Sequence, residues 1–282
     1  MQYAENEPVS LFLSELSLLE DRSSLLQSVQ LFQHPWLGKV LIINGEIQHI
    51  ESYQALYHEP LVHLPAAFLP EIETVLILGG GSLFAADEVL KYPSVKKVVL
   101  CDYDHNVIKM MLDHYSHARR VINDPRFVFV EQEGLSFIAQ EITKQYDLII
   151  NDCFNLSKES KKHGLSYYRE LSNLAGEKGI CVDVIYRHIF DKQTTVDTLK
   201  YLCEEQCVAF SMIVIPEYPG ILHIETIWGN NKNISQKCNR SLNHYHQDIL
   251  KGIAASPFLF FSPSFLPYYL YLPPYIRNQF NL

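Results

Sequence analysis

The sequence predicts an α/β protein, with a mostly parallel sheet between helices and a small N-terminal β-hairpin domain. Three observations support this fold class. Strand-like and helix-like segments alternate from residue 74 onward, a glycine triplet ends the first of these strands, and an Asn-Gly pair separates two apolar runs near the N-terminus. Strands that alternate with helices at this spacing form parallel sheets, because each helix returns the chain to the edge where the next strand begins.

The small domain is expected over residues 1–52. The run 27–32 (QSVQLF) alternates polar and apolar residues, and the run 39–43 (KVLII) is followed directly by Asn44-Gly45 and a further strand-like run. Asn-Gly suits the tight turn of a two-residue hairpin loop, since both residues tolerate positive φ. The pattern therefore predicts antiparallel strands in this part of the chain.

The larger domain is expected over residues 53–282. It should begin with a helix over 53–68, in which Leu56, Leu61, Val62 and Leu64 lie roughly on one face. The strands that we expect after it are 74–78, 97–101, 127–131, 146–151, 179–185 and 209–215. The helices that we expect are 82–92, 105–119, 134–143, 164–175 and 191–205. A last strand over 221–228 should close the sheet in the antiparallel sense.

The C-terminal segment 257–275 mixes aromatic side chains with repeated prolines. Prolines at this density should exclude a regular helix or a central strand. We expect an extended tail that packs on its own domain. The alternative is a contact between subunits, because large exposed apolar patches are uncommon on monomers. The assembly that we expect is a homodimer.

Composition narrows the classes of partner. The 282 residues carry 23 Lys+Arg against 32 Asp+Glu, a formal net charge of −9. This balance argues against nucleic acid as the partner, because phosphate binding needs a basic surface, and it suits a cationic substrate. The six cysteines show no zinc-site spacing and are interpreted as free thiols of a reducing compartment, hence a cytoplasmic protein. We expect no signal sequence and no membrane contact, since no apolar run reaches about 18 residues.

Small or polar residues follow four expected strands at their carboxyl ends, where ligands bind in parallel sheets. These residues are Gly79, Gly80, Gly81 and Ser82, then Asp102, then Glu133 with Gly134, then Asn151 with Asp152. Glycines let the backbone approach a ligand, and Asp102, 21 residues after Gly81, could hold ribose hydroxyls. The pattern predicts a nucleoside pocket, with helix capping as the alternative role of any single acid.

Seven segments in order resemble the spermidine synthase (polyamine aminopropyltransferase) family, over about residues 22–255. They are 38–48 (GKVLIINGEIQ), 57–59 (YHE), 75–81 (VLILGGG), 124–127 (DPRF), 146–152 (YDLIIND), 215–219 (IPEYP, where the family has Pro-Thr-Tyr-Pro) and 245–249 (YHQDI). The resemblance implies a Rossmann-like fold of the methyltransferase type. It also implies transfer of an aminopropyl group from decarboxylated S-adenosylmethionine to an amine such as putrescine, with methylthioadenosine as product.

The resemblance implies roles for individual residues. Asp152 would be the general base, and Tyr57 would orient the attacking amine. The nucleoside would be held by Gln27, Gly79, Gly80, Gly81, Ser82, Asp102, Glu133 and Gly134. The amine side would be lined by His58, Asn155, Asp183 and Tyr218. The reaction needs neither a metal nor a permanently bound cofactor, because the sulfonium of the co-substrate already activates the carbon.

The sequence departs from the family where cations would bind. The family's Gly-Gly-Gly-Asp-Gly-Gly loop reads GGGSLF at 79–84, so Ser82 replaces an acid that would meet the donor's ammonium. Asn155 replaces a second acid, and Asp183 could restore one charge. The loop 157–163 is rich in lysine instead of glycine and proline. The alternative is therefore a divergent S-adenosylmethionine-type transferase, or a nucleoside-binding relative without spermidine synthase activity.

Overall fold

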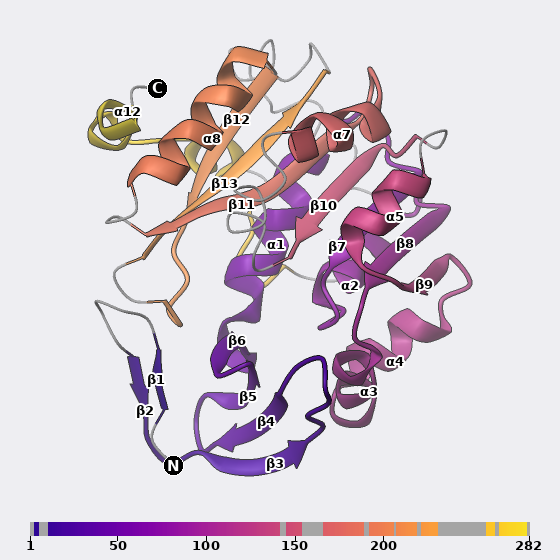
Figure 1. Cartoon of the computed structure of the whole chain (residues 1–282), viewed down its shortest axis with the longest axis vertical. Helices are drawn as coiled ribbons and strands as arrows, with labels where there is room; N and C mark the ends of the chain where they lie inside the picture. Colours follow the sequence, from indigo (N-terminus) through magenta and orange to yellow (C-terminus); the bar gives the residue numbers. More distant parts are fainter. Residues whose placement is uncertain are drawn as a thin grey trace.

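The computed structural model describes residues 3–5, 11–141, 145–153, 166–188, 192–205, 207–218, 221–230, 258–262 and 265–280 (Figure 1). Within these ranges the main sheet has the strand order β12-β13-β11-β10-β7-β8-β9. Its strands are β7 (Thr74–Gly79), β8 (Lys97–Asp102), β9 (Phe127–Glu131), β10 (Leu148–Asp152), β11 (Ile180–His188), β12 (Cys207–Ile213) and β13 (Ile221–Gly229). The pairings of β13 with β11 and with β12 are antiparallel and the other described pairings of this sheet are parallel, which confirms the predicted α/β class.

Helices cover both faces of this sheet, because its central strands are apolar on both sides. One face packs against α1 (Gln54–Ala66), α2 (Phe84–Leu90), α3 (His105–His114) and α4 (Ser116–Asn123). The other face packs against α5 (Gly134–Gln140), α7 (Ser166–Ala175) and α8 (Lys192–Glu205). Among the described residues, no helix combines the length and the apolar character needed to cross a bilayer.

Two expected helices differ from the prediction for local reasons. The helix expected over 105–119 is two helices, because Tyr115 adopts an extended conformation (φ −130°, ψ 132°) between α3 and α4. The helix expected from residue 82 begins only at Phe84. Leu83 precedes it with φ +65°, a left-handed conformation that cannot continue a right-handed helix.

The N-terminal sheet consists of β3 (Ser17–Asp21), β4 (Val29–His34), β5 (Gly38–Ile43) and β6 (Glu46–Ile50), joined as antiparallel neighbours. Asn44 (φ 52°) and Gly45 (φ 76°) form the predicted turn between β5 and β6. A separate pair, β1 (Tyr3–Glu5) and β2 (Leu11–Leu13), lies beside this sheet (Figure 1). Val29, Leu31 and Leu41 join the core of the main sheet, so the two units share apolar contacts. The domain boundary after residue 52 stays a prediction.

Helix α1 is buried on nearly all sides, so its predicted amphipathic character is wrong. The reason is that the C-terminal segment covers its outer face. The buried Glu59 carboxylate accepts the backbone N–H groups of Leu259, Phe260 and Phe261 at 2.6–2.8 Å. The described part of the tail therefore packs on its own chain, as expected.

The expectation that the tail contains no helix is wrong. Two short helices form there, α11 (Leu266–Tyr269) and α12 (Pro274–Phe280), and α12 lies beside α8 (Figure 1). Pro274 occupies the first position of α12. Proline is tolerated there because the first N–H of a helix has no acceptor within the helix, and the fixed φ of proline already suits the helix.

The hydrogen bonds between the tail and the Glu59 carboxylate predict that substitution of Glu59 lowers the stability of the protein. Glu59→Gln removes the negative charge from an acceptor of three N–H groups, so the free energy of unfolding should fall by about 1.5–3 kcal/mol. Urea denaturation measures this free energy, and Glu177→Gln, at an exposed glutamate, is the matched control. Equal stability of the two variants would show that the tail is held by its aromatic contacts alone.

Candidate active site

A cavity of about 570 Å³ lies at the carboxyl ends of the parallel strands, between the main sheet and the N-terminal sheet. Every predicted site residue within the described ranges lines it: Gln27, Tyr57, His58, Gly79, Gly80, Gly81, Ser82, Asp102, Glu133, Gly134, Asp152, Asp183 and Tyr218. Asn155 and the loop 157–163 lie outside the described residues. The fold thus gathers into one cavity residues that are dispersed over the sequence, while their roles stay predictions.

The glycine loop is placed directly against two carboxylates. Gly79 and Gly80 have φ of +74° and +73°. A Cβ on Gly79 would lie 2.8 Å from the carbonyl oxygen of Asp152, and one on Gly80 would lie 3.1 Å from Asp152 Oδ2. A Cβ on Gly81 would lie 3.0 Å from Asp102 Oδ2. No larger residue fits this backbone path without moving one of the two aspartates.

The far end of the loop is held by histidine and aromatic contacts. His117 Nε2 lies 2.9 Å from the Ser82 carbonyl oxygen, which places its proton on that nitrogen. Its ring stacks on Phe84 with centroids 3.9 Å apart. Burial lowers the pKa of His117, which favours the neutral ring. These contacts fix the loop at Ser82, where the family sequence would have an acid.

Asp102 organises the end of β8. Its Oδ2 accepts the Gly81 N–H and its Oδ1 accepts the Asp104 N–H, each at 3.1 Å. Burial raises the pKa of Asp102, and these hydrogen bonds oppose that effect. The adjacent Tyr103 hydroxyl donates to Gln27 Oε1 at 2.8 Å, which ties the N-terminal sheet to β8. The predicted ribose-binding group is therefore fixed in place by the protein's own hydrogen bonds.

Glu133 caps a helix and also lines the cavity. Its carboxylate accepts the N–H groups of Leu135 and Ser136 at 2.9 and 2.8 Å, so it caps α5, and it also lines the cavity. Asp104 likewise caps α3, through the Asn106 N–H. The capping alternative thus holds for both acids.

The general base predicted at Asp152 is oriented by Tyr57. The Tyr57 hydroxyl donates to Asp152 Oδ1 at 2.9 Å, and the Tyr57 ring packs edge-on against His58. Burial lowers the pKa of His58 to about 4, so its ring is neutral near pH 7. Its Nδ1–H donates to the Gln54 carbonyl at 2.8 Å, which leaves Nε2 as an acceptor. His58 is thus a buried, neutral residue of the cavity lining.

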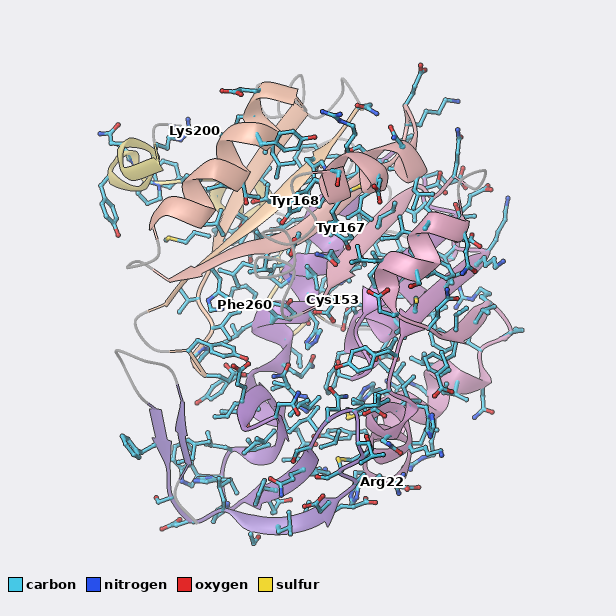
Figure 2. All side chains as sticks on the ribbon, in the orientation of Figure 1. Arg22, Cys153, Tyr167, Tyr168, Lys200 and Phe260 are labelled. Atoms are coloured by element: carbon cyan, nitrogen blue, oxygen red, sulfur yellow. The ribbon has the colours of Figure 1, made fainter. Side chains whose placement is uncertain are left out.

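Helix α7 contributes two tyrosines, Tyr167 and Tyr168, that reach the neighbouring strands β10 and β11 (Figure 2). The Tyr167 hydroxyl donates to Asn151 Oδ1 at 3.2 Å, and the Tyr168 hydroxyl lies 3.5 Å from Asp183 Oδ2. Cys153 lines the same region, and burial raises the pKa of its thiol well above its usual range. A protonated thiol is a poor nucleophile, so the raised pKa disfavours a nucleophilic role of Cys153.

Several lining residues were missed by sequence reasoning. They are Glu46, Gln48, His49, Gln54, Tyr103, Tyr167, Glu217 and His223. Most had no motif to reveal them, but Glu217 stands beside Tyr218 within the segment 215–219, where the family motif has Thr. The Tyr218 hydroxyl donates to the Ile47 carbonyl oxygen, which anchors this segment to β6.

The described lining of the cavity carries charged groups of one sign. Its described lining holds six carboxylates, from Glu46, Asp102, Glu133, Asp152, Asp183 and Glu217, and neither lysine nor arginine. A cavity of one charge sign with low-dielectric walls concentrates ligands of the opposite charge. Within the described ranges, no three His, Cys, Asp or Glu side chains are grouped as metal ligands would be.

These features define a Rossmann-like α/β protein of the methyltransferase type, with an acidic cavity at the carboxyl ends of its strands. The spermine/spermidine synthase domain model matches residues 54–238, and the chain belongs to this family. The spermidine synthase from Thermotoga maritima shares the fold with a TM-score of 0.81 at 21% identity, over 100% of this chain and 95% of that chain.

The curated relatives of this chain include proteins named for different reactions. Putrescine N-methyltransferase 2 of Nicotiana attenuata is 37% identical over 135 residues, which are 48% of this chain and 36% of that protein. The matched stretch therefore spans little more than a third of the plant protein. The polyamine aminopropyltransferase of Buchnera aphidicola subsp. Acyrthosiphon pisum (strain Tuc7) is 27% identical over 278 residues, which are 96% of this chain and 93% of that protein.

The close approach of the loop to Asp152 can be tested with two glycines of similar φ. A Cβ added to Gly45 (φ +76°) would have no atom within 4 Å, whereas one added to Gly79 (φ +74°) would meet a backbone oxygen at 2.8 Å. Gly45→Ala should lower the free energy of unfolding by about 1–2 kcal/mol, the cost of the left-handed conformation alone. Gly79→Ala should lower it further, because the loop or Asp152 must move. Equal losses in urea denaturation would contradict the tight packing described here.

Proposed function

We propose that this protein transfers an aminopropyl group from decarboxylated S-adenosylmethionine to an amine such as putrescine and releases methylthioadenosine. The observation that carries the proposal is the acidic cavity at strand ends that match the family's motifs, with the Tyr57–Asp152 pair within it. The donor bears a sulfonium and an ammonium, and a diamine acceptor is also cationic. The described lining of the cavity has carboxylates but neither lysine nor arginine, and such a lining suits cationic ligands.

The proposed step needs a base and alignment of the reactants. The amine nitrogen attacks the aminopropyl carbon next to sulfur, a C–N bond forms, and the C–S bonding electrons move to sulfur to give a neutral thioether. The attacking amine must first be neutral, so Asp152 takes its proton, directly or through water. Tyr57 holds the carboxylate through its hydroxyl. Orientation of nitrogen, carbon and sulfur in line supplies the rest of the rate enhancement.

The base assignment predicts the effect of an isosteric change. Asp152→Asn keeps the side-chain shape but removes the proton acceptor, so turnover should fall by about 10²-fold or more while methylthioadenosine still binds. Release of methylthioadenosine in the presence of putrescine measures turnover, and calorimetry measures binding. Turnover equal to the parent protein would move the base elsewhere, with Asp183 as the next candidate.

The nucleoside site predicts a separate effect at Asp102. Asp102→Ala removes the carboxylate proposed to hold the ribose hydroxyls, so binding of methylthioadenosine should weaken by about 1.5–3 kcal/mol. Glu177→Ala, an exposed acid, serves as the control in calorimetry. Because Asp102 also accepts the Gly81 N–H, unfolding curves of both variants are needed to separate binding from loop disruption. Unchanged affinity would remove the ribose assignment.

A second candidate is N-methyl transfer from intact S-adenosylmethionine. Two observations favour it: Ser82 is neutral where the family has an acid, and putrescine N-methyltransferases are among the relatives. Against it, intact S-adenosylmethionine carries a carboxylate, and the described lining offers neither lysine nor arginine to hold it. Product analysis with putrescine and each donor separates the two. Methylthioadenosine and an aminopropyl adduct support the first candidate, whereas S-adenosylhomocysteine and a methyl adduct support the second.

A homodimer and a cytoplasmic location accompany this proposal as predictions from the sequence. The exposed aromatic side chains of the tail, among them Phe265, Tyr268, Tyr271 and Tyr275, supply a surface that a second subunit could cover. Light scattering of the purified protein gives its mass in solution and tests the dimer directly.

A further inference from the structure

Three acids lie at or just after the carboxyl ends of strands of the main sheet. Asp102 ends β8, Asp152 ends β10, and Glu217 follows β12 at the opposite end of the strand order. All three line the cavity. On the proposed function, the nucleoside lies at Asp102 and the reacting nitrogen at Asp152. The cavity wall beyond Asp152 would then contact the part of the acceptor that does not react.

Glu217 is unusual among the lining acids because one of its oxygens is left unsatisfied. The side chain is buried, at 3% exposure, and Oε1 accepts the Ile50 N–H at 3.2 Å. Oε2 is buried and accepts no hydrogen bond from any residue that the structure describes. A buried carboxylate oxygen without a donor is costly, so the geometry calls for a donor from a ligand.

The surroundings of Glu217 suit a cation. Burial raises the pKa of Glu217, and backbone hydrogen bonds oppose that effect only in part. Tyr218 presents an aromatic ring 5.3 Å from the His223 ring, and both line the cavity. An ammonium that approached Glu217 would donate a charge-assisted hydrogen bond to its carboxylate, within a cavity that the Tyr218 and His223 rings also line.

We propose that Glu217 binds the second, non-reacting cationic group of the acceptor and thereby selects amines that carry two or more cationic groups. The inference rests on the proposed function for the location of the acceptor. It also accounts for the altered distribution of acids. The family motif has Thr where this chain has Glu217, while Ser82 and Asn155 replace acids that the family has. This chain thus gains a carboxylate at the acceptor end of the cavity while it loses others.

The test compares two amines of similar shape, putrescine and n-butylamine, which lacks the second cationic group. Calorimetry in the presence of methylthioadenosine gives the dissociation constants for the parent protein, Glu217→Gln and Glu217→Thr. The glutamine keeps an oxygen for the Ile50 N–H, and threonine restores the family residue, so both variants should fold. Putrescine should bind about 10- to 100-fold more weakly to both variants, the loss expected for one charge-assisted hydrogen bond. Binding of n-butylamine should not change.

Three results would overturn the inference. The first is equal weakening of both amines, because a merely structural role of Glu217 would affect them alike. The second is unchanged putrescine binding in the variants. The third is no binding of putrescine, cadaverine or spermidine by the parent protein. Because binding is measured without turnover, failure of the proposed function is seen separately: a Glu217-dependent affinity with no product from either donor would refute the transfer reaction alone.

Discussion

The backbone of the glycine loop lies between two carboxylates, and the geometry of the cavity depends on that contact. Gly79 and Gly80 leave no room for a side chain beside Asp152, and Gly81 leaves none beside Asp102. The same loop donates an N–H to Asp102 and places the start of α2. One turn of backbone therefore sets the positions of the proposed ribose-binding group and the proposed base at once.

Burial of these acids has an energetic consequence. Burial raises the pKa values of Asp102 and Glu217, because an ionised carboxylate loses hydration inside the protein. On the proposed function, ribose hydroxyls would offset this cost at Asp102 by donating hydrogen bonds, and a cationic group of the acceptor would offset it at Glu217. The described lining of the cavity holds six carboxylates and neither lysine nor arginine. This agrees with the net charge of −9, although overall charge alone could not show where the acids gather.

The family fold is retained in this chain while its charges are redistributed. Ser82 is held through its backbone carbonyl by His117, so the loop keeps its path without the acid that the family has there. Leu83 keeps a positive φ (+65°) at a position where the family has glycine. Relatives named as methyltransferases and as an aminopropyltransferase match this chain, so the fold does not decide the reaction and individual side chains must.

The sequence by itself determined most strands of the main sheet and the residues at their carboxyl ends. Apolar runs, glycines and the Asn44-Gly45 turn act over short distances in the chain, so they can be read locally, and they located Asp102 and Asp152 correctly at the cavity. Only the tertiary structure showed that Glu59 holds the tail through Leu259 and that Glu217 meets Ile50. These partners lie 200 and 167 residues apart, and no local pattern encodes such a contact. Burial, which sets the pKa values and leaves an oxygen of Glu217 unsatisfied, arises only when distant segments pack together.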